Sequence, residues 1–412
     1  MADRTIGPEN IRTMAEGPSR SARLLALALV AACLGGAALG EFRAGSPAAQ
    51  FEVADHWHMP LEPQGARPDG WTALESSLAP ADCGRCHVEQ FEQWRTSRHA
   101  QAFSPGLVGQ LLTYDAATTA QCLQCHAPLA EQRVIFEAKR ATGAADIREG
   151  LAAAGNACAG CHVRRHQRFG PPQRGTGATG ASRAGMQHGG VFRTAAFESS
   201  EFCSPCHQFR DGPTVNRKPL ENTYVEWKES PQAAPGLTCQ SCHMPDRRHL
   251  WRGIHDPALV ATGLTARTSV SEAGARFEIV NSGVGHAFPT YAAPRVVMHA
   301  VVLDRTGAPE PKTERTYVIA RTVIERAGEW IEVSDTRLLP GQAAALDIVW
   351  NGGDRARVWL EVLPDFYYAT EIYPHLLEAL PPASPAAQLI VEASADAARS
   401  SFMLFETELR RP

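Results

Sequence analysis

CGRCH at residues 83–87 is the first of five frames of one pattern that decides how this chain folds. The other four are CLQCH (122–126), CAGCH (158–162), CSPCH (203–207) and CQSCH (239–243). Each frame has two cysteines three residues apart with a histidine directly after the second, and together the frames hold ten of the chain's eleven cysteines. Zinc sites and redox dithiols also use paired cysteines, but neither requires that histidine every time.

The CxxCH pattern is the attachment signature of a c-type haem. Two thiols add to the two vinyl groups of one porphyrin, and the adjacent histidine offers its imidazole to the iron as the proximal axial ligand. The sequence therefore predicts five covalently attached c-type haems. The attaching residues are Cys83, Cys86, Cys122, Cys125, Cys158, Cys161, Cys203, Cys206, Cys239 and Cys242, and the proximal ligands are His87, His126, His162, His207 and His243.

The spacing of the motifs predicts a module built around its cofactors. Successive motifs start 39, 36, 45 and 36 residues apart, which is too little chain to enclose each haem in its own domain. We therefore expect the porphyrins to pack against one another within residues 46–263, surrounded by short helices and loops. Within 88–103, Phe91, Trp94, Arg98 and His99 fall near helical spacing. The glycine- and proline-rich stretch 170–190 is predicted to be a loop.

Beyond about residue 264 the pattern changes to short strands separated by turn residues. The expected strands are ARFEIV (275–280), RVVMHAVVL (295–303), TYVIARTVIE (316–325), EWIEVSD (329–335), AALDIVW (344–350), ARVWLEVL (356–363), QLIVEA (388–393) and FMLFETEL (402–409), with a helix inserted within 365–380. So many strands within residues 264–412 are typical of a β-sandwich, which we interpret as immunoglobulin-like. The predicted fold class is α+β: a helical, loop-rich multihaem module followed by this sandwich.

The N-terminal 45 residues predict export. A polar leader with several arginines precedes LLALALVAACLGGAALG (24–40), which carries no charge. A basic leader and abrupt polar flanks favour a signal or anchor segment over a buried helix of a cytosolic protein. Seventeen apolar residues are at the short edge of a membrane span, and AALG (37–40) offers a cleavage site. The expected location is the periplasm, with cleavage and anchoring in the inner membrane both left open.

Geometry restricts which of the ten remaining histidines can complete the iron coordination. His99 follows His87 by twelve residues, about 18 Å along a continuous helix, so it cannot reach the far side of that haem and would serve a different one. His166 follows His162 by four residues, which predicts that the two lie on one helix face. His299 lies in the middle of an expected strand. We therefore expect packing roles for His166 and His299.

The chain resembles the multihaem c-type cytochromes related to the cytochrome c554 family. The resemblance spans roughly residues 80–290 and rests on motifs that occur in order: EQWRTSRHAQAF (92–103), ESSEFCSPCHQF (198–209), NTYVEWKESP followed by GLTCQSCHMP (222–245), RHLWRGIHDP (248–257) and GHAFPT (285–290). It implies that five histidines at such positions are distal ligands: His99, His188, His249, His255 and His286. His286 would then reach from the start of the β-domain onto a haem, with His56 and His58 as substitutes for any ligand that fails.

These features favour an electron-transfer protein whose haems are mostly ligated by two histidines. One alternative is a redox enzyme that acts on a small nitrogen or sulfur species at one five-coordinate haem, although no catalytic residue is indicated. Another is a subunit of an end-to-end haem-wire assembly, which leaves a homo-oligomer open. The expected partners are redox proteins, a membrane quinol-oxidising complex among the alternatives. A net charge of −4 gives no indication of nucleic acid.

Overall fold

The computed structural model describes residues 51–182, 187–209, 214–234, 236–326 and 329–412. The predicted export segment and Cys33 lie outside these residues. Within them, no helix is both long and apolar enough to cross a membrane. The chain from Gln50 to Pro412 forms one compact unit, which contains mixed helix and sheet. The α+β class predicted from the sequence is thus confirmed.

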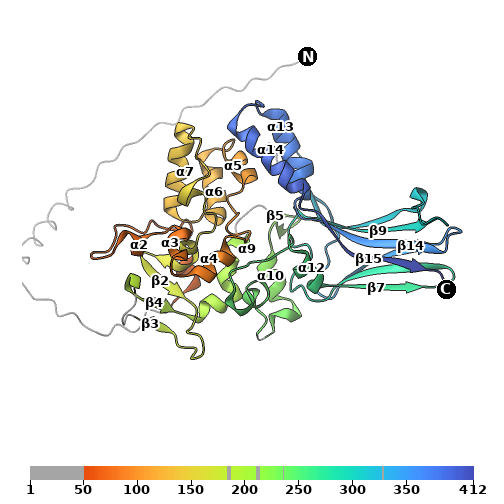
Figure 1. Cartoon of the computed structure of the whole chain (residues 1–412), viewed down its shortest axis with the longest axis horizontal. Coiled ribbons are helices and arrows are strands. Elements are labelled where there is room, and N and C mark those ends of the chain that lie inside the picture. Colours follow the sequence, from red (N-terminus) through yellow and green to blue (C-terminus); the bar gives the residue numbers. More distant parts are fainter. Residues whose placement is uncertain (1–50, 183–186, 210–213, 235, 327–328) are drawn as a thin grey trace, which may run out of the picture. The chain divides into compact units, whose positions relative to one another are not determined.

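The part of the chain that carries the motifs folds into short helices joined by turns (Figure 1). Helices this short bury little apolar surface of their own, so their stability depends on tertiary packing. Part of that packing is a core formed by α5, α6 and α7 around the fully buried Val108, Leu111 and Phe136. The helices are α1 (Val53–His56), α2 (Ala73–Ser76), α3 (Pro80–Gly84), α4 (Val88–Trp94), α5 (Pro105–Leu111), α6 (Ala116–His126), α7 (Ala130–Thr142), α8 (Cys158–His162), α9 (Ser204–His207), α10 (Thr223–Lys228), α11 (Cys239–His243) and α12 (Pro257–Gly263).

Two small sheets also belong to this part. The first has the strand order β1-β2-β4-β3, and the second is the hairpin β5-β6. Their bounds are β1 (Val163–Arg164), β2 (Gln167–Gly170), β3 (Gly180–Ser182), β4 (Val191–Arg193), β5 (Thr214–Val215) and β6 (Lys218–Pro219). The predicted loop at 170–190 therefore contains one short strand, β3, which pairs with β4.

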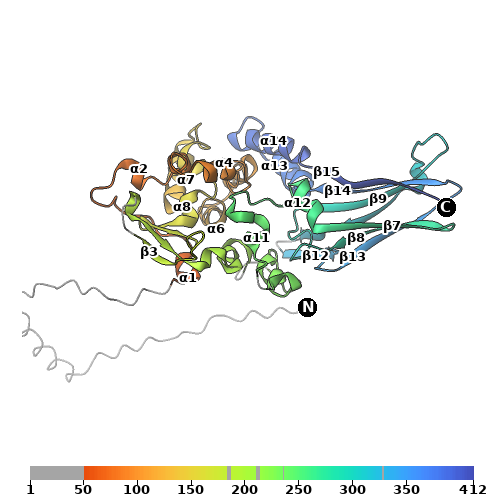
Figure 2. The same ribbon diagram turned by 60° about the horizontal axis from the view of Figure 1, so that its bottom comes forward.

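The rest of the chain is dominated by antiparallel strands (Figures 1 and 2). One sheet has the order β10-β9-β14-β15, another β13-β8-β7, and β11 and β12 form a separate hairpin. Along β14, Ala356, Val358, Leu360 and Val362 are fully buried and alternate with partly exposed residues, the period of two that a one-sided strand requires. The strands are β7 (Leu264–Val270), β8 (Gly274–Asn281), β9 (Arg295–Leu303), β10 (Arg315–Ile319), β11 (Arg321–Arg326), β12 (Glu329–Asp335), β13 (Ala343–Val349), β14 (Arg355–Leu363) and β15 (Phe402–Arg410).

The two larger sheets share a single hydrophobic core. Phe277 and Ile279 of one sheet and Met298 and Leu360 of the other belong to the same buried cluster. This arrangement explains the alternating apolar pattern of the sequence. The specific immunoglobulin-like topology stays a prediction.

Two strand predictions need correction, and one strand was not predicted. QLIVEA is not a strand but part of helix α14 (Pro385–Ala398), where Ser384 caps the first turn and Pro385 occupies its first position. A short apolar run does not by itself distinguish strand from helix, and here the cap and the alanine-rich flanks decide. TYVIARTVIE is divided between β10 and β11, and β7 is an additional strand.

The helices inserted between β14 and β15 contact the motif-bearing part of the chain. They comprise a π-helical turn (Tyr368–Ile372), α13 (Tyr373–Ala379) and α14. Ile390 of α14 is fully buried, and a β-carbon at Gly109 of α5 would lie 2.7 Å from its Cδ1 atom. Helices α5 and α14 thus approach closely because Gly109 has no side chain. The inserted helix predicted within 365–380 is present.

Candidate haem-binding sites

Each CxxCH motif lies on a helical turn. Helices α8 and α11 consist of the motif itself, α6 ends with the second motif, and α9 contains most of the fourth. Residues at positions i, i+3 and i+4 lie on one face of a helix. The two cysteines and the histidine of a motif therefore point to the same side, as attachment to one porphyrin and its iron requires.

Four of the five motif histidines have a hydrogen bond at Nδ1. These bonds join His126 to the carbonyl of Ala102 (3.0 Å), His162 to that of Phe169 (2.8 Å), His243 to that of Arg252 (2.5 Å), and His207 to the Glu221 carboxylate and the Tyr291 hydroxyl (3.1 Å each). A partner at Nδ1 fixes the orientation of an imidazole and leaves Nε2 to bind a metal. In these four histidines Nε2 is thus available to a metal ion.

Four motif histidines also face a second histidine. The ring centres are 6.5 Å apart for His87 and His188, 6.2 Å for His207 and His99, 6.2 Å for His162 and His249, and 6.4 Å for His243 and His286. Two imidazoles bound at about 2 Å to opposite sides of one metal ion have their centres about 6 Å apart. The separations therefore fit one haem iron between the members of each pair.

The paired histidines from outside the motifs are poor proton acceptors. Burial lowers the pKa of His99 to about 3 and those of His249 and His286 to about 4. Burial also lowers the pKa of His188. An imidazole must be neutral to donate a lone pair to a metal. Burial thus keeps these rings in the protonation state that coordination needs.

His126 differs from the other motif histidines. Among the described residues, no second imidazole faces the ring of His126 as the partners of the other four motif histidines do. His255, the remaining distal candidate, has its Nε2 atom 3.0 Å from the Asp365 carboxylate and 3.1 Å from the Arg98 guanidinium. The structure does not place His255 opposite a motif histidine, so this arrangement gives no support to its predicted ligand role.

The other histidines occupy different surroundings. His56 is buried among aromatic rings, and its Nε2 atom is 2.8 Å from the Cys161 carbonyl oxygen, whereas His58 is exposed. The helix face predicted for His162 and His166 is wrong, because α8 ends at His162. His166 contacts the carbonyl of Gly65 (3.3 Å). His299 stacks on Trp359 and contacts Glu361 (3.1 Å). The packing contacts of His166 and His299 agree with the roles expected for them.

The motifs lie next to one another in space. Thiols of different motifs lie close enough to shift each other's pKa: Cys83 and Cys158, Cys125 and Cys206, and Cys203 and Cys239. The first motif is therefore adjacent to the third, the second to the fourth, and the fourth to the fifth. Cys161 also raises the pKa of Cys203 and of Cys206, which indicates that the third motif lies near the fourth. The fourth motif thus has three neighbours.

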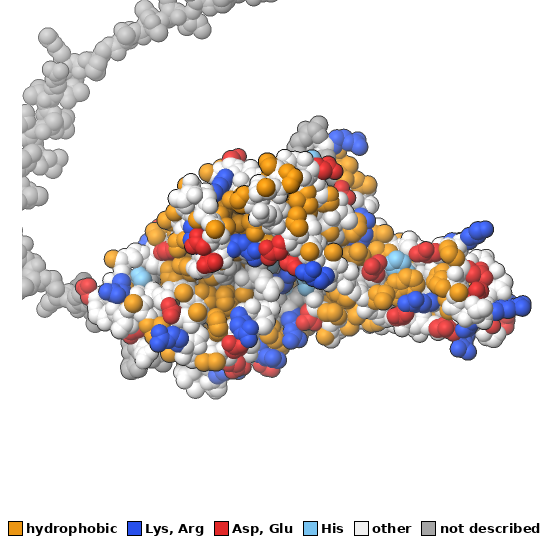
Figure 3. All heavy atoms as spheres, turned by 45° about the horizontal axis from the view of Figure 1, so that its top comes forward, with side chains coloured by type: hydrophobic (Ala, Val, Ile, Leu, Met, Phe, Trp, Pro, Cys, Tyr) orange, Lys and Arg blue, Asp and Glu red, His pale blue; other side chains and the backbone are white. Residues whose placement is uncertain are grey.

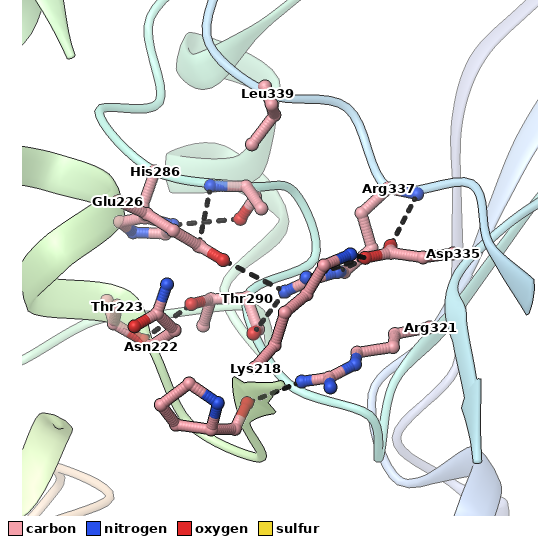
Figure 4. Close-up of polar contacts among 12 residues, drawn as sticks. Lys218, Asn222, Thr223, Glu226, His286, Thr290, Arg321, Asp335, Arg337 and Leu339 are labelled. Carbon is pink, nitrogen blue, oxygen red and sulfur yellow. Dashed lines mark hydrogen bonds and ion pairs between the residues drawn. The ribbon is translucent and has the colours of Figure 1, made fainter. Parts of the chain in front are cut away.

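His286 is held by residues that sequence reasoning did not identify, two of which, Glu226 and Arg337, are drawn in Figure 4. Asn281 donates to its backbone carbonyl (3.0 Å), and the Glu226 carboxylate accepts the N–H of Ala287 (3.1 Å). Glu226 also pairs with Arg337 (3.3 Å). These three residues lie outside any haem-attachment motif, and only Asn281 has a local signal, the turn-forming Asn-Ser-Gly sequence that it begins.

Comparison with known proteins agrees with this picture. Residues 82–162, which include the first three motifs, match the family model described as cytochrome c554 and c-prime. A penta-haem cytochrome c552 from Thermochromatium tepidum matches with a TM-score of 0.56 over 82% of this chain and 99% of its own. The two sequences are 18% identical, so this match shows the fold alone. No curated protein matches the chain.

Proposed function

We propose that this chain, a multihaem c-type cytochrome related to the cytochrome c554 family, is an electron-transfer protein that carries five c-type haems. The observation that carries the proposal is the set of four histidine pairs, each of which joins a CxxCH histidine to one from a distant segment. The predicted export segment favours the periplasm as its location, and the residues that would attach the protein to a membrane lie outside the described chain.

A c-type haem, when bound, supplies an iron that changes between the ferric and ferrous states. The cysteines would hold it covalently and the paired histidines would bind the iron from both sides. Two protein ligands leave no position for a substrate, which suits a carrier better than a catalyst. Hydrogen bonds such as that of His207 to Glu221 would tune the basicity of the ligands and with it the redox potential.

Two further features support electron transfer. Thiols of neighbouring motifs lie close enough to shift each other's pKa, so cofactors attached to them would lie close together. The face drawn in Figure 3 carries acidic and basic side chains interspersed with hydrophobic ones, a composition that suits transient contact with redox partner proteins. The β-domain, interpreted as an immunoglobulin-like sandwich, would cap the module and provide a docking face.

The proposal is tested by measuring haem content and spin state together. We expect the mass of the purified protein to include five haems, and most of the ferric iron to be low-spin in its EPR spectrum. Fewer than five haems would show that a motif is not used. Predominantly high-spin iron would contradict ligation by histidine pairs.

A redox enzyme is the second candidate, and His126 is the observation that favours it. A haem held by this histidine has no second imidazole from the described residues, so its iron would be open to a small ligand. Addition of nitrite, sulfite or hydroxylamine should then perturb one high-spin haem in five. A spectrum unchanged by all three would count against catalysis at this position.

A further inference from the structure

The peptide bond between His286 and Ala287 is held at both of its polar ends by side chains, and Figure 4 shows the end that Glu226 holds. Asn281, which is fully buried, donates to the carbonyl oxygen of this bond at 3.0 Å. Glu226 accepts its N–H at 3.1 Å. The imidazole Nδ1 of His286 lies 2.9 Å from the carbonyl of Ala287. These contacts fix the backbone and the ring together, with Nε2 left for the iron.

Glu226 reaches this bond from a different segment of the chain. It belongs to α10, and the contact between α10 and the His286 segment is close because Gly285 has no side chain: a β-carbon there would lie 3.1 Å from Trp227. The second carboxylate oxygen of Glu226 is 3.3 Å from Arg337. Arg337 in turn donates to the carbonyl of Thr290 at 3.0 Å. Helix α10, the His286 segment and the segment that contains Thr290 are therefore joined through the buried Glu226–Arg337 pair.

A contribution to the stability of the fold does not by itself explain why Glu226 and Arg337 form a buried ion pair. The side chains of Glu226 and Arg337 are only 9% and 4% exposed, and two buried charges often stabilise a fold less than apolar residues of the same volume. Burial raises the pKa of Glu226 although Arg337 opposes the change. For Arg337, burial favours loss of the proton, but Asp335 and Glu226 outweigh it and raise the pKa. Arg337 donates to both carboxylate oxygens of Asp335, at 2.9 and 3.0 Å, and lies 3.3 Å from only one oxygen of Glu226. The other oxygen of Glu226 accepts the Ala287 N–H of the ligand segment.

We propose that Glu226 is a positioning residue that holds His286 opposite His243 and sets the redox potential of the haem bound between them. The inference rests on the proposed ligation by this histidine pair. The hydrogen bond to Ala287 would slow the departure of His286 from the iron. The negative charge of Glu226 would stabilise the ferric state, because reduction adds an electron.

The test compares Glu226→Gln and Glu226→Ala with Glu229→Gln, which removes an exposed carboxylate from the end of the same helix. Carbon monoxide added to the reduced protein reports how often His286 leaves its iron. We expect binding at this haem to be at least about tenfold faster in Glu226→Ala, equivalent to about 1.4 kcal/mol. Glu226→Gln, whose amide oxygen still accepts the Ala287 N–H, should lie in between. In both Glu226 variants one haem should titrate at a higher potential, with up to about a tenfold change in its oxidised-to-reduced ratio, or about 59 mV.

The His286→Ala variant separates the two possible failures. It should add one haem that binds carbon monoxide rapidly, beyond any binding at the His126 position. If it does not, the proposed ligation is wrong. If it does, but both Glu226 variants keep the potentials and binding rates of the wild type, only the role of Glu226 is refuted. Should Glu226→Ala fail to take up haem, Glu226→Gln carries the test.

Discussion

Replacement of His99 by alanine tests the pairing of histidines most directly. The ring of His99 lies 6.2 Å from that of His207 and 4.7 Å from that of Trp251. Alanine leaves His207 without a partner on the opposite side of the iron. Trp251 cannot replace the imidazole as a ligand because an indole N–H is a donor only. We therefore expect the haem of the fourth motif to become high-spin.

The size of the effect follows from the pairing. Of the five motif histidines, four face a second histidine, so one fifth of the ferric iron in the wild-type protein should be high-spin. His99→Ala should raise this share to two fifths. His255→Ala is the matched control: His255 was also expected to be a ligand, but it contacts Asp365 and Arg98 instead. Its removal should leave the share at one fifth.

The assay is quantitative EPR of the oxidised proteins, normalised to haem content measured by mass. A high-spin signal that does not increase in His99→Ala would refute the pairing of His99 with His207. An increase in the high-spin share in His255→Ala would show that His255 is a distal ligand after all. The haem of His126 would then no longer be the one haem without a second histidine. Both variants should keep five haems because every CxxCH residue is intact.

Three further predictions concern stability. Arg321→Leu should lower the free energy of unfolding by about 3–5 kcal/mol, because a buried carboxylate and three backbone carbonyls lose their donor; a thermal melt followed by circular dichroism would detect this, and an unchanged midpoint would contradict it. Burial opposes the ionisation of Asp335, but Arg337 and Lys218 outweigh it and lower its pKa. Its contribution to stability is therefore complete above the ordinary pKa of about 3.9 and is lost as the pH falls below that value, so Asp335→Asn should flatten the acid limb of stability against pH. Ile390→Ala should cost about 2–5 kcal/mol by opening a cavity against α5, and unfolding by urea that matches the wild type would show that α14 does not pack there.

Local chemistry explains what the sequence could predict. A CxxCH motif needs only one helical turn, so its position and its helical geometry follow from the residues themselves, and its proximal ligand stays a prediction. Most strands could be located because a sheet with one buried face requires alternation over a few residues. The strand prediction for QLIVEA was wrong because a short apolar run also suits a buried helix. The residues that decide for the helix, Ser384 and Pro385, lie before the run.

The features that the sequence could not predict depend on contacts between residues far apart in the chain. The second histidine of each pair comes from elsewhere in the chain, as His99 does for His207. The sequence offered five candidate distal histidines for five haem irons, but their number does not show where each side chain lies. His255 lies in a cluster with Asp365 and Arg98 instead. Glu226 and Arg337 are charged residues in unremarkable surroundings, and their role depends on the approach of α10 to the β-domain.

Five motifs of one pattern therefore do not imply five equal sites. In the proposed function, the motif would fix the covalent attachment and one axial ligand through a local turn, whereas tertiary contacts would supply the second ligand. At the fifth motif, that contact depends on the β-domain, since His286 is held by Asn281 on one side and by Glu226 on the other. At the second motif, no described imidazole fills the corresponding place beside His126. Redox potential and access to small ligands should thus differ most between these two sites, because their surroundings differ although their motifs match.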